Sequence, residues 1–257
     1  MTAPSDMQPL VRENIRLAAT VMLVRDSGTG LEVYMVKRPG RGDFPDLHVF
    51  PGGKVDEEDF NPALCYELAD QVASERLGIA AGGVRYWVAV ARECFEECGV
   101  LMVRRNGSML DFRDDRVFSR FESLREDVLA GNLGFVQMCE QENLQIACDM
   151  LGYFSHWITP EMAPRRFDTR FFLAAMPGDQ ATLAHTDETA DDDWVSPREA
   201  LDLYRKNRWQ MIDPTLRSLE TLSQYDSVGE ALVGVQGGNH LMPLTPELNR
   251  QGMQPLR

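Results

Sequence analysis

The sequence predicts an α/β fold in which short apolar strands alternate with amphipathic helices. Two apolar runs, at residues 17–24 and 31–37, flank a turn-rich segment at 26–30 and predict a β-hairpin. The clearest helical period covers 84–98 and stops at Gly99, a residue type that suits the position after a helix. No internal repeat or low-complexity linker divides the 257 residues, so we predict one elaborated domain.

The other elements are predicted from the same signals, in chain order. The run from His48 to Gly53 predicts a strand that breaks at a glycine pair, where the backbone can approach a ligand closely. Helical spacing then runs from Asn61 to about Leu77. Further along we predict two helices within 114–149, strands at 152–159, 167–175 and near 194–195, a helix at 197–206 and another that starts at Pro214.

The composition excludes some classes of partner. The chain has 40 acidic and 26 basic residues, and its formal net charge of −14 disfavours binding to nucleic acid or to an anionic membrane. A small polyanionic substrate stays compatible with this charge, because a bound divalent cation reverses the local sign. An apolar content of 44% is ordinary for a packed globular protein.

The sequence also carries expectations about location. No run approaches the roughly 20 apolar residues that span a bilayer, and the opening MTAPSDMQPL has neither a basic start nor an apolar stretch. Five cysteines, an odd number without a compact spacing, favour a reducing compartment over a disulfide framework. We therefore predict a soluble cytoplasmic protein.

The helix predicted at 84–98 contains the largest group of candidate functional side chains. At about 100° per residue, one stripe of this helix is apolar and the other side is acidic. The apolar stripe holds Trp87, Ala91, Cys94 and Cys98, and the acidic side holds Glu93, Glu96 and Glu97. The ordinary interpretation of the acidic side is a face exposed to water. The alternative is a cation site, because three carboxylates at i, i+3 and i+4 repel one another unless a divalent cation binds them.

Other chemistry is less well supported. Cys94 and Cys98 have a spacing that could hold a soft metal, but their place on the apolar stripe favours buried core thiols. The four histidines include no H-E-x-x-H pair. The chain also has no G-x-S-x-G elbow and no G-x4-G-K-[S/T] loop, so serine hydrolases and P-loop proteins lack their central residues here.

The acidic helix and the glycine pair together resemble the Nudix box, a motif written G-x5-E-x7-R-E-U-x-E-E-x-G-U in which U is aliphatic. The second half of the motif matches Arg92-Glu93, Glu96-Glu97 and Gly99-Val100. The stretch at 50–56, Phe-Pro-Gly-Gly-Lys-Val-Asp, resembles the glycine-rich loop that precedes the helix in that family. Both halves are present in the right order.

This sequence departs from the box in three ways. Asp59 stands where the family has Glu, and Cys94 stands where it has an aliphatic residue. Asp59 also lies 33 residues before Arg92 instead of 8, so about 25 residues are inserted inside the motif. The insert, at about 60–85, is itself helical in pattern, so it can leave the loop and return to the helix.

A split box of this kind is similar to the subgroup that includes the mammalian Nudix type 19 coenzyme A diphosphatases. The stretches at 159–161 and 164–172 also resemble that subgroup, and the resemblance covers roughly residues 15–205. It implies a Nudix-like α/β/α sandwich with a mixed sheet and helical insertions. The predicted organisation is one domain over 1–257 with the insert at about 60–85, a helical arm at about 114–149 and a C-terminal tail at about 237–257.

The resemblance also implies a function. It predicts a metal-dependent pyrophosphohydrolase that cuts the phosphoanhydride of a nucleoside diphosphate-linked substrate, with coenzyme A or acyl-coenzyme A preferred. ADP-ribose, NADH and dinucleoside polyphosphates are alternative substrates. A Nudix-like module that senses a nucleotide without cutting it is a different alternative, which the full set of Arg92, Glu93, Glu96 and Glu97 disfavours. The expected partner is a small nucleotide conjugate, and a homodimer is left open.

The family analogy assigns a role to each matching residue. Hard oxygen ligands suit Mg²⁺ or Mn²⁺, and Glu97 is the firmest direct ligand. Glu96 binds the cation directly or through water, and Glu93 is a ligand or the base that takes the proton of the attacking water. Arg92 orients Glu93 through a charge-assisted hydrogen bond. The carbonyl at Gly53 is the backbone ligand that we expect.

Three further assignments lie outside the box. Glu188, with Asp187 as its rival, is the candidate for a distal acidic ligand, against the alternative of an ordinary acidic loop. Arg166 and Arg170 are candidates for binding substrate phosphates, although alternation along a strand can also leave such residues exposed to water. Gly52 is expected beside the substrate, where a glycine lets the backbone approach closely.

Overall fold

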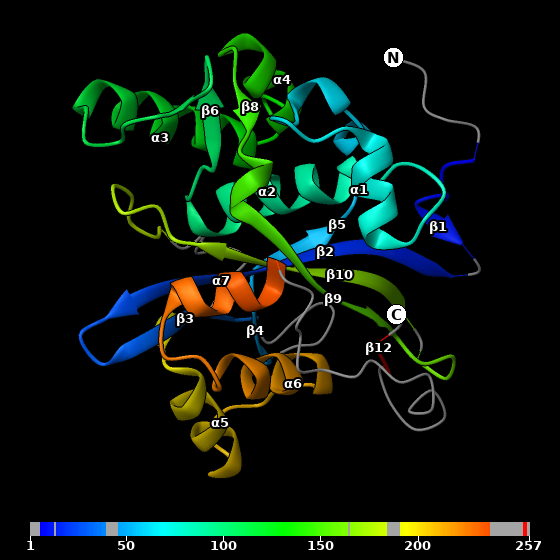
Figure 1. Cartoon of the computed structure of the whole chain (residues 1–257), viewed down its shortest axis with the longest axis vertical. Helices are drawn as coiled ribbons and strands as arrows, with labels where there is room; N and C mark the ends of the chain where they lie inside the picture. Colours follow the sequence, from blue (N-terminus) through cyan, green and yellow to red (C-terminus); the bar gives the residue numbers. More distant parts are fainter. Residues whose placement is uncertain are drawn as a thin grey trace.

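The computed structural model describes residues 6–12, 14–39, 46–163, 165–183, 191–236 and 254–255. Helices cover both sides of a large mixed sheet (Figure 1). The helices are α1 (Asp70–Leu77), α2 (Val84–Cys98), α3 (Asp115–Leu129), α4 (Phe135–Gln141), α5 (Pro197–Arg205), α6 (Asp213–Leu222) and α7 (Val228–Gln236). Short 3₁₀ turns occur at Glu57–Asp59, Pro62–Leu64 and Cys148–Met150.

The large sheet follows the order β11-β3-β2-β10-β9-β12, with β1 and β5 also paired to β2 and β4 paired to β3. The pairing of β2 with β10 is parallel and the other pairings are antiparallel, so the sheet is mixed. Its strands are β1 (Val11–Arg12), β2 (Ile15–Ser27), β3 (Gly30–Lys37), β4 (His48–Val49), β5 (Gly52–Lys54), β9 (Leu151–Ile158), β10 (Arg166–Ala175), β11 (Asp191–Val195) and β12 (Gln254–Pro255). A second, smaller sheet contains β6 (Val103–Arg105), β7 (Ser108–Met109) and β8 (Gln145–Ile146).

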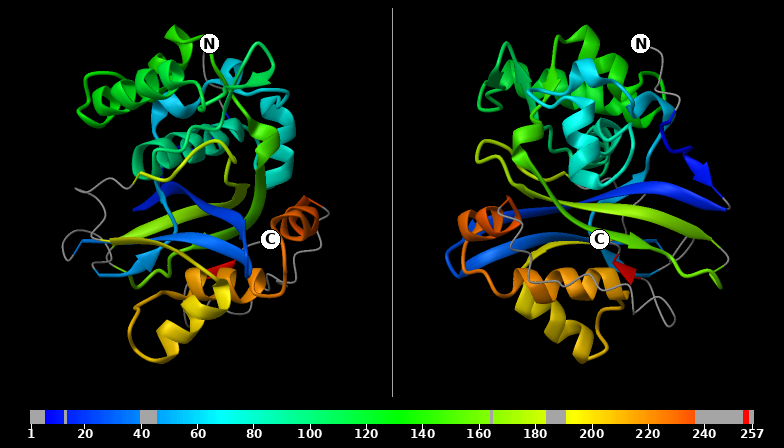
Figure 2. Two further views of the ribbon diagram at one scale, coloured as in Figure 1. Left: turned by 90° about the vertical axis from the view of Figure 1, so that its left-hand side faces the viewer. Right: turned by 45° about the vertical axis from the view of Figure 1, so that its right-hand side comes forward.

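Strand β2 shows how the sequence builds two cores. Successive side chains of a strand point to opposite faces of the sheet. Leu17, Ala19 and Val21 pack into the core under α2, whereas Met22 and Val24 pack into the core that α5, α6 and α7 cover. Figures 1 and 2 show the same arrangement, with α1 to α4 on one face of the sheet and α5 to α7 on the other. The predicted α/β/α sandwich with a mixed sheet is confirmed.

Several predicted elements are confirmed. The hairpin is formed by β2 and β3, and the helix predicted at 84–98 is α2, followed by Gly99 in the left-handed conformation. Pro214 lies in the first turn of α6, where its missing N–H costs nothing.

The helix predicted from Asn61 to Leu77 is wrong in its first half, because only Asp70–Leu77 is α-helical. The chain before α1 is instead held against the small sheet, where Tyr66 N donates to Ile146 O and Cys65 forms a bridge with the same residue. Such long-range pairing overrides a local helical period.

The predicted arm and tail differ in how much of each the structure describes. The arm at 114–149 contains α3 and α4 and then turns into β8. The tail at 237–257 lies outside the described residues, except for β12. The division into one domain with an insert and an arm stays a prediction. Among the described residues, none of the helices combines the length and the apolar character that a bilayer crossing requires.

Candidate active site

Helix α2 is the scaffold of the candidate site. Two hydrogen bonds to its neighbour α1 hold the beginning of this helix. The Asp70 carboxylate accepts from Gly82 N at 2.9 Å and from Val84 N at 3.1 Å. The helix ends at Gly99, whose φ of 71° is a conformation that glycine adopts without strain. Its apolar stripe is anchored by Trp87, which is fully buried and donates a hydrogen bond to Leu151 O.

The acidic side of α2 is not a surface exposed to water. Glu93 is 8% exposed and Glu97 is 9% exposed, and Glu96 is half-buried. The ordinary interpretation of this side is therefore wrong for Glu93 and Glu97. The expectation for Cys94 and Cys98 is confirmed, because both are fully buried free thiols.

The glycine pair of β5 packs directly against these carboxylates. Gly52 N donates to Glu97 Oε2 at 2.8 Å. A Cβ atom at Gly53 would lie 2.4 Å from Glu93 Oε1, so the Glu93 carboxylate occupies the space that any other residue would need. On its other side β5 pairs with β2, where Gly53 lies opposite Ala19. The glycines therefore let strand backbone and helix carboxylates come together.

Arg92 joins the two halves of the split motif. Its Nε and Nη2 each donate to the Asp59 carboxylate at 3.0 Å, and Nη2 also donates to Lys54 O at 2.7 Å. On the helix side, Nη1 donates to Glu93 Oε1 at 2.7 Å and to Glu96 Oε2 at 3.2 Å. One guanidinium thus fixes Glu93 and Glu96 relative to the loop that precedes the insert.

The sequence places Asp59 at the acidic position of the box but assigns it no partner. It is 1% exposed, and its carboxylate accepts from Asp56 N at 2.7 Å as well as from Arg92. Burial raises the pKa of Asp59, and the hydrogen bonds and charge of Arg92 oppose this rise. Its place six residues after Gly53 was the available signal, because the Nudix box has an acid there.

The electrostatics of the site favour a cation. Burial raises the pKa of Glu93 to about 8, with Arg92 opposing the rise and the charges of Glu97 and Glu96 adding to it. Ionised carboxylates in this position are therefore costly without a positive partner. Carboxylate and carbonyl oxygens are the donors that Mg²⁺ and Mn²⁺ accept.

The donor set fits such a cation without forming a closed cage. Among the described residues, no three His, Cys, Asp or Glu side chains already surround one point. Glu97 is instead turned to Gly52 N, and Arg92 holds Glu93 and Glu96. Mg²⁺ is commonly held by one or two carboxylates and keeps several waters, so a partial set of protein oxygens is what it needs.

Comparison with known families decides the assignment. Residues 79–222, more than half of the chain, match the family described as the NUDT19 Nudix domain. The chain belongs to this Nudix family.

Individual relatives agree with this family. The chain is 26% identical over 234 residues to the acyl-coenzyme A diphosphatase NUDT19 of Xenopus laevis, covering 77% of the chain and 61% of the relative. It is 29% identical over 215 residues to putative nudix hydrolase 7 of Caenorhabditis elegans, covering 83% of the chain and 62% of the relative. The chain therefore spans about three fifths of the length of these relatives.

A solved structure extends the agreement to the fold. The crystal structure of a NUDIX hydrolase from Alicyclobacillus acidocaldarius matches with a TM-score of 0.64 and 26% sequence identity. The match covers 85% of the chain and 95% of that structure. The sheet and the helices that surround the Nudix box are thus shared over nearly the whole of a known Nudix structure.

The two arginines predicted to bind phosphates lie on β10. The hydrogen bonds described for them below go to residues other than the carboxylates of α2. Arg170 is 3% exposed, and its Nη1 donates to Leu77 O and to the Tyr153 hydroxyl. Arg166 is half-buried, and its Nε donates to Thr159 O at 3.1 Å. The burial of Arg170 favours a structural role, and the phosphate-binding role of Arg166 stays a prediction.

The predicted distal ligand Glu188 and its rival Asp187 lie outside the described residues. Leu183 is the last described residue before them, and its carbonyl accepts a hydrogen bond from Arg125 at 2.8 Å. Arg125 also donates to Phe95 O and Glu96 O at the end of α2. Sequence reasoning missed Arg125, because nothing in the local pattern of α3 marks it as a partner of another helix.

Proposed function

We propose that this Nudix chain hydrolyses a phosphoanhydride bond in a nucleoside diphosphate-linked substrate, and that coenzyme A or its acyl thioesters are that substrate. The burial of Glu93 and Glu97 against the Gly52 and Gly53 backbone carries the proposal, because Arg92 shares one positive charge among Glu93, Glu96 and Asp59, and a bound cation offsets the negative charge that remains. The curated relative from Xenopus laevis is named an acyl-coenzyme A diphosphatase, which supports the substrate class.

The chemistry follows from the positions of the acidic side chains. Glu97 and Glu96, with the Gly53 carbonyl, are the residues that would hold Mg²⁺ or Mn²⁺. When bound, such a cation would offset the negative charge of the diphosphate and supply Lewis-acid chemistry for the attack of water. Glu93, fixed by Arg92 at 2.7 Å, accepts the proton of the attacking water.

The location of the protein belongs to the same proposal. All five cysteines are buried free thiols, which is consistent with a reducing compartment. A cytoplasmic location is therefore the one that we propose.

The test compares three proteins on one substrate panel with added Mg²⁺. We expect the wild type to cleave coenzyme A into 3′,5′-ADP and a 4′-phosphopantetheine product, with a higher kcat/KM than for dephospho-coenzyme A, ADP-ribose or NADH. Glu97→Gln should keep the fold and lower kcat by roughly a hundredfold or more, because it removes ligand charge where the transition state is negative. Products are identified by mass, and folding is checked by thermal melting.

Glu126→Gln is the matched control, since it makes the same change on an exposed side chain of α3. It should leave kcat within about twofold of the wild-type value. A folded Glu97→Gln protein with wild-type kcat, or full activity after exhaustive chelation, would contradict the metal site. Coenzyme A turnover no faster than that of the poorest substrate would reject the substrate class and leave the phosphoanhydride chemistry in place.

A further inference from the structure

The last turn of α2 carries two of the acidic residues of the site. Glu96 and Glu97 lie directly before Cys98, where the helix ends. The last four carbonyls of an α-helix have no partner further along the helix, and helix ends fray more readily than helix interiors. The positions of these two carboxylates therefore depend on the groups that hold this turn from outside α2.

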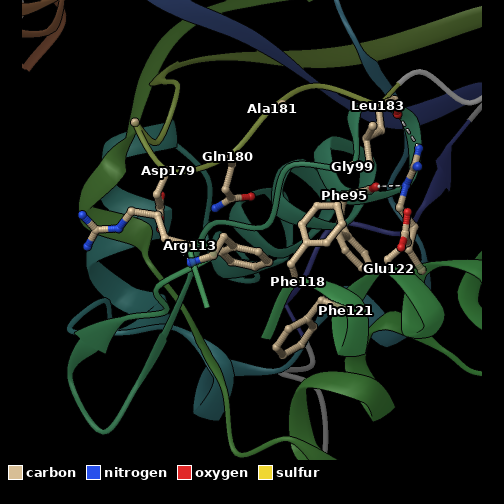
Figure 3. A pocket seen from close by; sticks show the side chains of 13 residues that line it. Phe95, Gly99, Arg113, Phe118, Phe121, Glu122, Asp179, Gln180, Ala181 and Leu183 are labelled. Atoms are coloured by element: carbon tan, nitrogen blue, oxygen red, sulfur yellow. Dashed lines mark hydrogen bonds between the residues drawn. The ribbon is translucent and has the colours of Figure 1, made fainter. Parts of the chain in front are cut away.

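Arg125 of helix α3 holds the turn from outside. Its Nε donates to Phe95 O at 2.8 Å, and its Nη2 donates to Glu96 O at 2.7 Å. The same Nη2 donates to Leu183 O at 2.8 Å, and Leu183 N donates to Cys98 O at 2.7 Å. The bonds to Phe95 and Leu183 are the dashed lines in Figure 3, beside a cavity of about 390 Å³. The end of α2, α3 and the chain at Leu183 are thus joined in one closed ring of hydrogen bonds.

Glu96 is held at both its side chain and its backbone. Arg92 Nη1 donates to the Glu96 carboxylate at 3.2 Å, whereas Arg125 Nη2 donates to the Glu96 carbonyl. Arg92 belongs to the Nudix box, but Arg125 comes from a helix outside it. Functional groups of a site must stay within about 0.5 Å of their working geometry. Loosening the last turn of α2 should therefore displace Glu96 and Glu97 as ligands.

The position of Arg125 and its charge have opposite consequences for a cation. A guanidinium at the C-terminal end of α2 offsets the partial negative charge of the helix, which stabilises this end. The same positive charge repels a divalent cation at the nearby carboxylates. Removing the charge alone should tighten metal binding, whereas removing the support of the turn should weaken it. The sign of the change in metal affinity therefore separates the two roles.

We infer that Arg125 is a positioning residue, which acts through the last turn of α2 to hold Glu96 and Glu97 in the geometry that binds the divalent cation. Helix α3 then contributes to the active site although it lies outside the Nudix box. This inference rests on the metal site of the proposed function.

The test measures binding of Mn²⁺ to the full chain without substrate, by electron paramagnetic resonance. Arg125→Met removes the charge and all three hydrogen bonds, and the Mn²⁺ dissociation constant should rise by roughly tenfold or more, as for the loss of other groups that orient metal ligands. Arg125→Lys keeps the charge but has one nitrogen in place of the guanidinium fork. Its dissociation constant should fall between those of the wild type and Arg125→Met, and kcat at saturating Mn²⁺ should follow the same order.

Arg105→Met is the matched control. Arg105 is half-buried like Arg125, and it donates to the backbone carbonyl of Glu142 at 3.1 Å and to the carboxylate of the same residue at 3.0 Å. Its loss should lower the melting temperature and leave the Mn²⁺ dissociation constant within about twofold of the wild-type value. All proteins are compared well below their melting temperatures.

An unchanged or lower dissociation constant in folded Arg125→Met overturns the inference, because Arg125 then acts on stability or through its charge alone. An equal rise in Arg105→Met also overturns it, since any loss of stability would then weaken metal binding. If Arg125→Met does not fold, Arg125→Lys decides, and a wild-type constant in that variant overturns the inference. In each case Mn²⁺ binding and turnover by the wild type leave the proposed function standing. A wild type that binds no Mn²⁺ rejects the metal site itself, and the role of Arg125 with it.

Discussion

Gly52 and Gly53 are adjacent in the chain but lack a side chain for different reasons. A Cβ atom at Gly52 would lie 2.4 Å from Ala19 O and 2.7 Å from Thr20 Cα, which are backbone atoms of β2. The three atoms nearest to a Cβ atom at Gly53 would all belong to the Glu93 carboxylate, the far end of a flexible side chain. The first glycine is needed for the strand pairing, and the second makes room for an acid of the site.

This difference predicts that one alanine substitution mainly lowers stability and the other mainly lowers turnover. Gly52→Ala should lower the free energy of unfolding by about 2 kcal/mol or more, because the backbone of β2 cannot give way cheaply. Gly53→Ala should change it by less than about 1 kcal/mol and yet lower kcat by roughly a hundredfold, because it displaces the Glu93 carboxylate. Urea unfolding and steady-state kinetics measure the two quantities. Wild-type kcat in Gly53→Ala would show that the position of Glu93 does not matter for turnover.

Some residue contacts of the site can be predicted from the sequence and others cannot. The spacing of Glu93, Glu96 and Glu97 is local, so the helical period by itself predicts that they share one side of the helix. The contact of Arg92 with Asp59 spans 33 residues, and a helical period carries no information about that distance. The burial of Arg170 also cannot be predicted from sequence. Alternation along a strand indicates which face of the sheet a side chain is on, but not which elements cover that face.

Helices α1 and α2 are coupled through one carboxylate. Asp70 lies in the first turn of α1, and its two oxygens accept from Gly82 N and Val84 N. Val84 is the first residue of α2, so the insert supplies hydrogen-bond acceptors to the beginning of the catalytic helix. This arrangement explains why an insertion inside the motif need not disturb the helix that follows it.

Removing that carboxylate should destabilise the protein. We expect Asp70→Ala to lower the free energy of unfolding by about 1–2 kcal/mol, as for the loss of a helix cap. Asp115→Ala is the matched control, because Asp115 is an exposed acid in the first turn of α3, and its loss should cost about 0.5 kcal/mol or less. Urea unfolding compares the two variants. Equal losses for both would show that Asp70 acts only through its charge.

Helices and strands can be predicted from the sequence where the residues adjacent in the chain determine their structure. Helix α2 and the β2–β3 hairpin are predictable because a helical period, a terminal glycine and a turn-rich loop are all local. The prediction for residues 61–69 is wrong, since their conformation depends on pairing with β8, about 80 residues away. Helix α7 is absent from the predicted elements.

The whole molecule buries a charged cluster between the sheet and the layer of α1 and α2. His156 on β9 and Asp168 on β10 share a hydrogen bond, and Arg170 lies 3.9 Å from the same carboxylate. All three are at most 5% exposed. Arg170 and Tyr86 face each other across the layers with 5.8 Å between the guanidinium carbon and the ring centre. The fold therefore contains a polar layer whose protonation is linked to its stability.

His156 makes this linkage testable. Burial lowers the pKa of His156 from its usual 6.5, the Asp168 hydrogen bond opposes the shift, and the Arg170 charge adds to it. The folded state thus binds this proton less readily than the unfolded state does. The stability that neutral His156 contributes is present above pH 6.5 and is lost as the pH falls below that value. The pKa of Asp168 is also lowered: burial raises it, but His156 and Arg170 together lower it by more. The stability that ionised Asp168 contributes is lost only as the pH falls below about 3.8.

We therefore expect a difference between the wild type and His156→Gln that depends on pH. Glutamine can still donate to Asp168 but does not titrate in this range, so it removes the loss of stability on acidification. The free energy of unfolding, measured in urea, should fall further between pH 8 and pH 5 in the wild type than in the variant. All other titrating groups are common to both proteins, so the contribution of the net charge of −14 cancels in the comparison. Parallel pH profiles would mean that His156 keeps its ordinary pKa in the folded chain, and the buried layer would then hold the imidazole as readily charged as neutral.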